Sequence, residues 1–112
     1  MKPGEIWWAS LPEPTGSSLG IRRPILIVQF NPFNSSRIST VVVAAITSNL
    51  RLSAAPGNVR ITKRESGLGK ASVVNVSQVL TLERTLLTEQ VRRLSEKRML
   101  EIDQGLRMVL GL

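Results

Sequence analysis

The sequence predicts an α+β fold that is mostly β: a small, strongly bent, partly closed antiparallel barrel followed by one C-terminal helix. Short apolar blocks of strand length alternate with long loops that are rich in proline, glycine and serine. Several of these blocks consist largely of β-branched residues, which are typical of strands. From Ser95 onward the spacing of the apolar residues changes to that of a helix.

The first half of the chain is predicted to contain three strands. Residues 5–10 (EIWWAS) form a short aromatic strand, and residues 11–21 form a long loop with two prolines, two glycines and two serines. Residues 23–30 (RPILIVQF) and 40–47 (TVVVAAIT) lack polar alternation, so we expect both to be buried strands. A turn-rich connection over residues 31–39 joins them.

The second half continues with shorter or less regular strands. A second long loop follows over residues 48–58, and residues 58–62 (NVRIT) alternate as in a half-exposed strand. Residues 63–70 (KRESGLGK) form a basic loop that contains two glycines. Residues 72–82 (SVVNVSQVLTL) are compatible with one bent strand or with two short ones.

A C-terminal helix is expected to cover the barrel core. Ser95 is a suitable N-cap residue, and Gly111 is suited to the position just after the helix. Gly105 costs about 1 kcal/mol relative to alanine inside a helix, which suggests a close packing contact there. One face carries the apolar residues, which are Met99, Ile102, Leu106, Val109 and Leu110.

The composition of the chain excludes several classes of function. The chain has 112 residues, which suits one domain over residues 1–112. No apolar stretch reaches the roughly 18 residues of a membrane span, and the first residues lack a secretory h-region, so we expect a cytoplasmic protein without a membrane partner. The chain has no cysteine and no histidine, which excludes disulfides, thiol chemistry and a His-based triad and leaves no expectation of a metal or cofactor.

The charge points to an anionic partner. Fifteen lysines and arginines against eight carboxylates give a net charge of +7. Residues 51–112 hold eleven of the basic and six of the acidic side chains. The electrostatic field of such a positively charged surface attracts polyanions. Nucleic acid is the first candidate and an acidic protein segment is the second, while a basic surface without a partner stays open as an alternative.

Several segments, in the same order and at compatible spacings, resemble the MazF/PemK family of bacterial toxins. The opening strand is followed by a Pro-Thr-Gly-Ser loop and by an Arg-Pro pair before an apolar run, and the likeness continues to the C-terminal helix. The segments are Gly4–Trp8, Pro14–Ser17, Arg22–Val28, Asn34, Ala44–Ser48, Gly67–Leu68, Ser72–Val74, Ser77–Val79, Leu94–Ser95, Met99 and Ile102–Leu106.

The resemblance implies an SH3-like barrel with a C-terminal helix that acts as a homodimer. It implies sequence-specific, metal-independent cleavage of single-stranded RNA, and control by an antitoxin whose acidic C-terminal segment covers the RNA site. The arginine that directly precedes the family's proline falls on Arg23. The threonine that ends the following strand falls on Thr47. Both positions are therefore the expected catalytic residues.

RNA cleavage by the adjacent 2′-hydroxyl builds negative charge on the non-bridging phosphate oxygens. The planar guanidinium of Arg23 suits that charge, because its fork can hold two oxygens. The Thr47 hydroxyl can donate to a phosphate oxygen. Arg22 is expected to point to the other side of the strand. The residues expected to contact RNA are Gly16, Ser17, Arg22, Ser48, Arg51, Lys63, Arg64, Lys70 and Gln78.

Two departures from the family pattern concern how RNA is contacted. The family's usual Gly-Ser-Glu-Gln is Gly16-Ser17-Ser18-Leu19 here, and the arginine that usually follows the "QV" pair is Leu80. Proteins usually stack nucleic-acid bases on aromatic side chains. Adjacent residues of a strand face opposite sides of the sheet, so one of Trp7 and Trp8 is expected to be buried.

Two alternative functions stay open. The first is a toxin of the same fold that inhibits DNA gyrase without catalysis, although that mode relies on C-terminal aromatic residues and this chain ends RMVLGL. The second is a nucleic-acid-binding barrel without activity.

Overall fold

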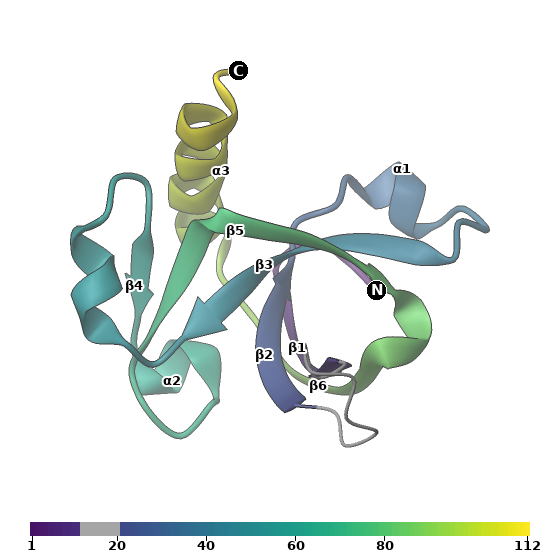
Figure 1. Cartoon of the computed structure of the whole chain (residues 1–112), viewed down its shortest axis with the longest axis horizontal. Helices are drawn as coiled ribbons and strands as arrows, with labels where there is room; N and C mark the ends of the chain where they lie inside the picture. Colours follow the sequence, from purple (N-terminus) through teal and green to yellow (C-terminus); the bar gives the residue numbers. More distant parts are fainter. Residues whose placement is uncertain (12–20) are drawn as a thin grey trace.

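The computed structural model describes residues 1–11 and 21–112. One six-stranded antiparallel sheet, in the order β4-β5-β3-β2-β1-β6, curls into a half-barrel (Figure 1). This confirms the predicted fold class. The strands are β1 (Glu5–Leu11), β2 (Ile21–Ile27), β3 (Thr40–Thr47), β4 (Val59–Ile61), β5 (Ser72–Glu83) and β6 (Leu87–Arg93).

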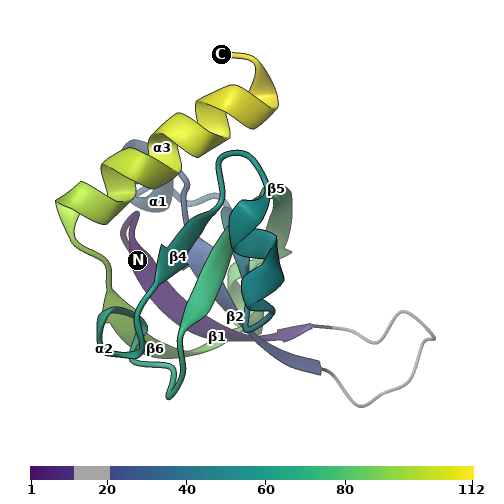
Figure 2. The ribbon, with the colours of Figure 1, turned by 90° about the vertical axis from the view of Figure 1, so that its left-hand side faces the viewer.

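Helical segments lie between the strands and at the end of the chain. The long helix crosses one end of the curled sheet, over β4 and β5 (Figure 2). Within the described residues, no helix is long and apolar enough to cross a membrane. The helical segments are α1 (Asn31–Asn34), η1 (Leu50–Ala54), α2 (Lys63–Ser66), η2 (Arg84–Leu86) and α3 (Glu96–Leu110).

The central strands contain continuous apolar runs, residues 24–27 of β2 and 41–46 of β3, because both faces of the sheet are covered there. In β2, Ile25 and Ile27 belong to one buried cluster, and Leu26 between them belongs to the other. β3 divides in the same way, with Val41 and Val43 on one side and Ala44 on the other. The absence of alternating polar residues in these runs therefore reflects burial on both faces of the sheet.

Helix α3 begins and ends as predicted. The Ser95 hydroxyl accepts a hydrogen bond from the backbone N–H of Arg98, and Gly111 adopts the left-handed conformation at the C-terminal end. Ile102 is fully buried in the core, and Met99 and Leu106 pack against it.

The close contact expected at Gly105 is confirmed. A Cβ atom on Gly105 would lie 2.2 Å from the carbonyl oxygen of Gly57, in the loop before β4. The expectation for the last turn is wrong: Val109 and Leu110 are 44% and 59% exposed, because the end of α3 extends past the sheet (Figure 2).

Other boundaries also differ from the sequence expectation. β2 begins at Ile21, which pairs with Leu11, and it ends before Val28, where Gln29 turns to bond the Asn34 side chain. The expected loop over 63–70 begins with the short helix α2. Residues 72–83 form one strand whose register with β3 shifts once, which settles the choice between one bent strand and two.

Strand β6 has no counterpart among the strands expected from the sequence. It is an edge strand, LTEQVRR, in which Leu87 is buried, Val91 is half-buried and the other side chains are exposed. Its pairing with β1 is interrupted by two register shifts. Charged and irregular edge strands of this kind prevent pairing with further strands. Because few of their residues are apolar, their sequence lacks the alternating pattern from which a strand is predicted.

Candidate functional site

The register of the sheet brings the two expected catalytic positions together. β2 pairs with β3 as far as Ile25↔Ala45, and Arg23 and Thr47 each lie two residues beyond this last pair, on the same faces of their strands as Ile25 and Ala45. Side chains at opposite positions of an antiparallel pair lie on the same face. Arg23 is also paired with Ala9 of β1, so its backbone is held between two neighbouring strands.

Two small cavities meet at this pair of positions. One, of about 180 Å³, is lined by Trp8, Ser48, Lys70 and other residues. The second, of about 240 Å³, includes Gln78 in its lining. Both cavities share the same four residues, which are Arg23, Pro24, Ile46 and Thr47.

The two adjacent arginines have different surroundings. The Arg22 guanidinium lies over the ring of Trp8, with its central carbon 4.5 Å from the ring centroid, and forms an ion pair with Glu89. Arg23 is exposed, and within residues 1–11 and 21–112 no side-chain hydrogen bond or ion pair engages its guanidinium. Among the described residues the Arg23 donors are thus available to a ligand, whereas Arg22 is held by a ring and a carboxylate.

The Thr47 hydroxyl is positioned by the chain that follows it. Its oxygen accepts a hydrogen bond of 3.1 Å from the backbone N–H of Asn49. A hydroxyl has one hydrogen to donate as well as lone pairs to accept. Because the backbone donor occupies a lone pair, the Thr47 hydrogen remains able to bond a phosphate oxygen at the mouth of the cavity.

The remaining expected contact residues fall into separate groups. Ser48 and Lys70 line the same cavity as Arg22, and Gln78 lines the neighbouring one. Lys63 and Arg64 line a different hollow, described below. Arg51 lies on η1 and lines none of these three. Gly16 and Ser17 lie outside the described residues.

The structure adds residues that were not expected at the site from the sequence. Ser72 and Leu68 line the Arg22 cavity, and Glu89 pairs with Arg22 from β6. The prediction that one tryptophan is buried is wrong, since both Trp7 and Trp8 are half-buried. Trp7 packs against a core cluster, and its indole N–H donates a hydrogen bond to Glu5. Trp8, on the other face of β1, stacks against the guanidinium of Arg22.

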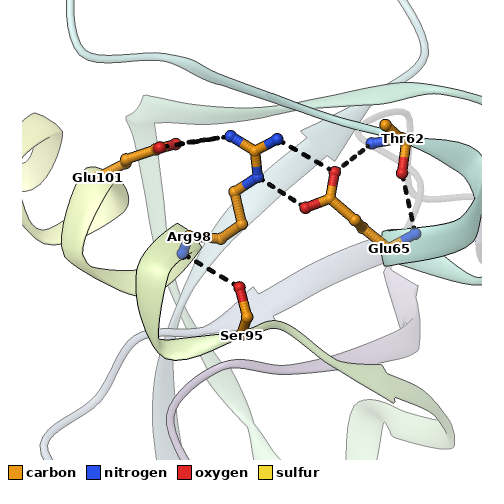
Figure 3. A network of polar contacts seen from close by, with 5 residues as sticks. All are labelled: Thr62, Glu65, Ser95, Arg98 and Glu101. Atoms are coloured by element: carbon orange, nitrogen blue, oxygen red, sulfur yellow. Dashed lines mark hydrogen bonds and ion pairs between the residues drawn. The ribbon is translucent and has the colours of Figure 1, made fainter.

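A second polar network fixes α2 against α3 (Figure 3). Arg98 donates to Glu65 through Nε, at 2.6 Å, and through Nη2, at 3.3 Å, and its Nη1 lies 3.0 Å from Glu101. Glu65 also closes a capping box with Thr62. Hydrogen bonds from Arg98 and from the Thr62 backbone lower the pKa of Glu65 to about 2, and the Glu65 bond raises the pKa of Arg98.

This network predicts a pH-dependent stability. The pKa of Glu65 falls from 4.5 to about 2 on folding, so its contribution is complete above about pH 4.5 and is lost as the pH falls toward 2. Glu65→Gln should lower the free energy of unfolding by about 1–2 kcal/mol at neutral pH, a value reduced for the partial exposure of the pair.

Chemical denaturation at pH 7, 4 and 2.5 would measure this effect. The difference between wild type and Glu65→Gln should shrink as the pH falls. Glu83→Gln, at an exposed carboxylate outside the network, is the control and should show no such trend. A difference that stayed constant from pH 7 to 2.5 would contradict the assignment.

Solved structures of toxins share this fold. An endoribonuclease in complex with its cognate antitoxin, from a Mycobacterial species, superposes with a TM-score of 0.82 at 23% identity and covers 100% of this chain and 96% of that chain. The MazE-MazF (Form-II) structure from Deinococcus radiodurans also gives 0.82, at 21% identity and with the same shares covered. The curled sheet with its C-terminal helix is therefore the fold of the MazF class of toxins.

The amino-acid sequence shows the family. Residues 2–110 match the PemK-like, MazF-like toxins of type II toxin-antitoxin systems. Endoribonuclease MazF6 of Mycobacterium tuberculosis (strain ATCC 25618 / H37Rv) is 47% identical over 108 residues, which are 96% of this chain and 95% of that protein. Endoribonuclease MazF of Staphylococcus epidermidis is 37% identical over 112 residues, with 100% and 92% covered. The chain belongs to the PemK-like, MazF-like toxin family, and the resemblance is confirmed.

Proposed function

We propose that this chain cleaves single-stranded RNA at a phosphate bound between Arg23 and Thr47. The chain is the endoribonuclease toxin of a type II toxin-antitoxin pair, as the family match and the relatives named endoribonuclease support. The observation that carries the proposed site is that Arg23 and Thr47 line the same two cavities.

The proposed reaction uses the RNA's own nucleophile. The 2′-oxygen attacks the adjacent phosphorus and loses its proton, the bond from phosphorus to the 5′-oxygen breaks, and the departing oxygen is protonated. The products are a cyclic phosphate and a 5′-hydroxyl. Negative charge grows on the non-bridging oxygens, where the Arg23 guanidinium donates two hydrogen bonds and the Thr47 hydroxyl donates one.

The strands make this arrangement rigid. Arg23 and Thr47 project from neighbouring strands that are anchored close to them by buried residues, Ile25 in β2 and Ile46 in β3. Pro24 fixes its own backbone φ angle beside the catalytic arginine. Donors that are held in place before the reaction stabilise developing charge without the cost of reorganisation.

The proposed partners follow from charge and family. The toxin is held by a cognate antitoxin whose acidic C-terminal segment competes with RNA for the basic surface, which the net charge of +7 supports. It acts in the cytoplasm, where mRNA is available, as one domain over residues 1–112, and as a homodimer. Solved structures with the same fold include a complex of MazE with MazF and a complex of an endoribonuclease with its cognate antitoxin.

One assay separates this function from the alternatives. The purified protein is incubated with a long single-stranded RNA, with and without EDTA, and the cut ends are mapped. We expect cuts at a short recurring sequence, with 5′-hydroxyl ends and undiminished cleavage in EDTA. Intact RNA that is nevertheless bound would favour the non-catalytic barrel, and inhibition of gyrase supercoiling with intact RNA would favour the gyrase-directed alternative.

A further inference from the structure

A second cationic hollow lies beside the proposed cleavage site. It has a volume of about 610 Å³ and is lined by Lys63, Arg64, Gly67, Gly69 and Arg92. We call this set of residues the α2–β6 groove, since α2 lies against β6 in Figure 2. Each of its three charged lining residues is basic.

The two acids on the same elements are engaged elsewhere. Glu65, on α2, is bound by Arg98 of α3 (Figure 3) and is not among the residues that line the groove. Glu89, on β6, is bound by Arg22. Arginines from other elements thus pair with both carboxylates, and within the described part of the chain no ion pair involves any of the three groove cations.

One short loop separates the groove from the proposed cleavage site. Gly67 and Gly69 line the groove, while Leu68 and Lys70 line the cavity that contains Arg23. Alternate residues of this segment therefore face the two hollows. Four residues span at most about 14 Å, so the hollows lie within a few nucleotides of each other along an extended strand.

The loop is shaped to leave the groove open. Gly67 has a φ of 69°, and a Cβ there would lie 2.8 Å from Nε of Arg92, so the glycine lets the arginine side chain rest on the backbone. A Cβ on Gly69 would meet nothing within 4 Å, which leaves that wall accessible. Leu68 packs into the core and anchors the loop between them.

We propose that the α2–β6 groove binds the phosphate backbone of the RNA strand a few nucleotides away from the bond that is cut. This inference rests on the proposed function, because it assigns the groove to the same RNA. Lys63, Arg64 and Arg92 bind phosphates without reading bases. The groove therefore adds affinity for long RNA over short RNA and leaves the choice of cleavage sequence to the Arg23 site.

Salt dependence of binding tests the groove without requiring cleavage. Oligouridylates of about 5 and about 15 nucleotides are titrated against an Arg23→Ala protein at several salt concentrations. Replacing Lys63, Arg64 and Arg92 by glutamine should reduce the slope of log affinity against log salt for the long RNA by about 2, and weaken its binding about 10- to 100-fold at 0.1 M salt. In the triple variant, the slope for the long RNA should equal the slope measured for the short RNA.

Two further variants keep the result interpretable. Lys97→Gln with Arg107→Gln, on the exposed side of α3, removes two charges outside the groove and should leave the difference between long and short RNA in place. Lys63→Gln with Arg64→Gln retains Arg92 and should lower the slope by about 1.4, which tests the proposal if the triple variant does not fold.

The outcomes distinguish failure of this inference from failure of the proposed function. An unchanged slope for the long RNA in both groove variants would overturn the inference even if the wild-type protein cuts RNA. Loss of binding to a glutamate-rich peptide with unchanged RNA binding would assign the groove to an acidic protein partner instead. A wild-type protein that never cuts RNA would overturn the proposed function, while the slope would still report on the groove.

Discussion

Arg23→Ala is expected to lower the rate of RNA cleavage by about 100- to 1,000-fold or more, because it removes donors that act on the charge of the transition state. The fold should remain intact, since the side chain is exposed and surface substitutions usually change stability by less than about 0.5 kcal/mol. Single-turnover cleavage of the mapped RNA, together with a thermal unfolding curve, would measure both effects.

Matched variants show whether the effect belongs to this arginine. Arg23→Lys keeps the charge but loses the planar fork, so it should recover only part of the activity. Arg37→Ala removes an exposed arginine that does not line either cavity and should cleave like wild type. Cleavage by Arg23→Ala at the wild-type rate would remove Arg23 from the proposed mechanism.

Gly105→Ala is expected to have the largest effect on stability. Alanine would ordinarily favour a helix by about 1 kcal/mol over glycine. Here the new Cβ would lie 2.2 Å from the Gly57 carbonyl oxygen and 2.9 Å from its carbonyl carbon. Both atoms belong to the backbone, so α3 or the loop before β4 must move. We expect a net loss of about 1–3 kcal/mol, as for other overpacked sites.

Thermal and chemical denaturation would measure this loss. Gln104→Ala, at the neighbouring exposed position of α3, is the matched control and should stay within about 0.5 kcal/mol of wild type. Gly57→Ala should also destabilise, because Gly57 has a φ of 83° and a Cβ there would lie 3.0 Å from the Gly105 Cα. A Gly105→Ala protein as stable as Gln104→Ala would show that the contact is looser than the structure has it.

The central strands and the last helix could be predicted from the sequence because the spacing of their apolar residues directly reflects which of them are buried. β3 has the predicted bounds, 40–47, since an apolar run between turn residues marks both ends. α3 is bounded by Ser95 and Gly111, whose side-chain and backbone chemistry is local to the helix ends. β6 could not be predicted, because only Leu87 and Val91 turn inward along a charged edge strand.

For the candidate site, the sequence by itself supplied the prediction that Arg23 and Thr47 carry the chemistry, through the order and spacing of the segments that resemble the toxin family. Only the tertiary structure decided what surrounds Arg23 and its neighbour Arg22. The β1–β2–β6 arrangement ties Arg22 to Trp8 and Glu89 at one cavity, whereas Arg23 lines both cavities together with Thr47. Pairing between strands far apart in the chain sets these contacts, and the sequence of a single strand carries no record of its partner's register.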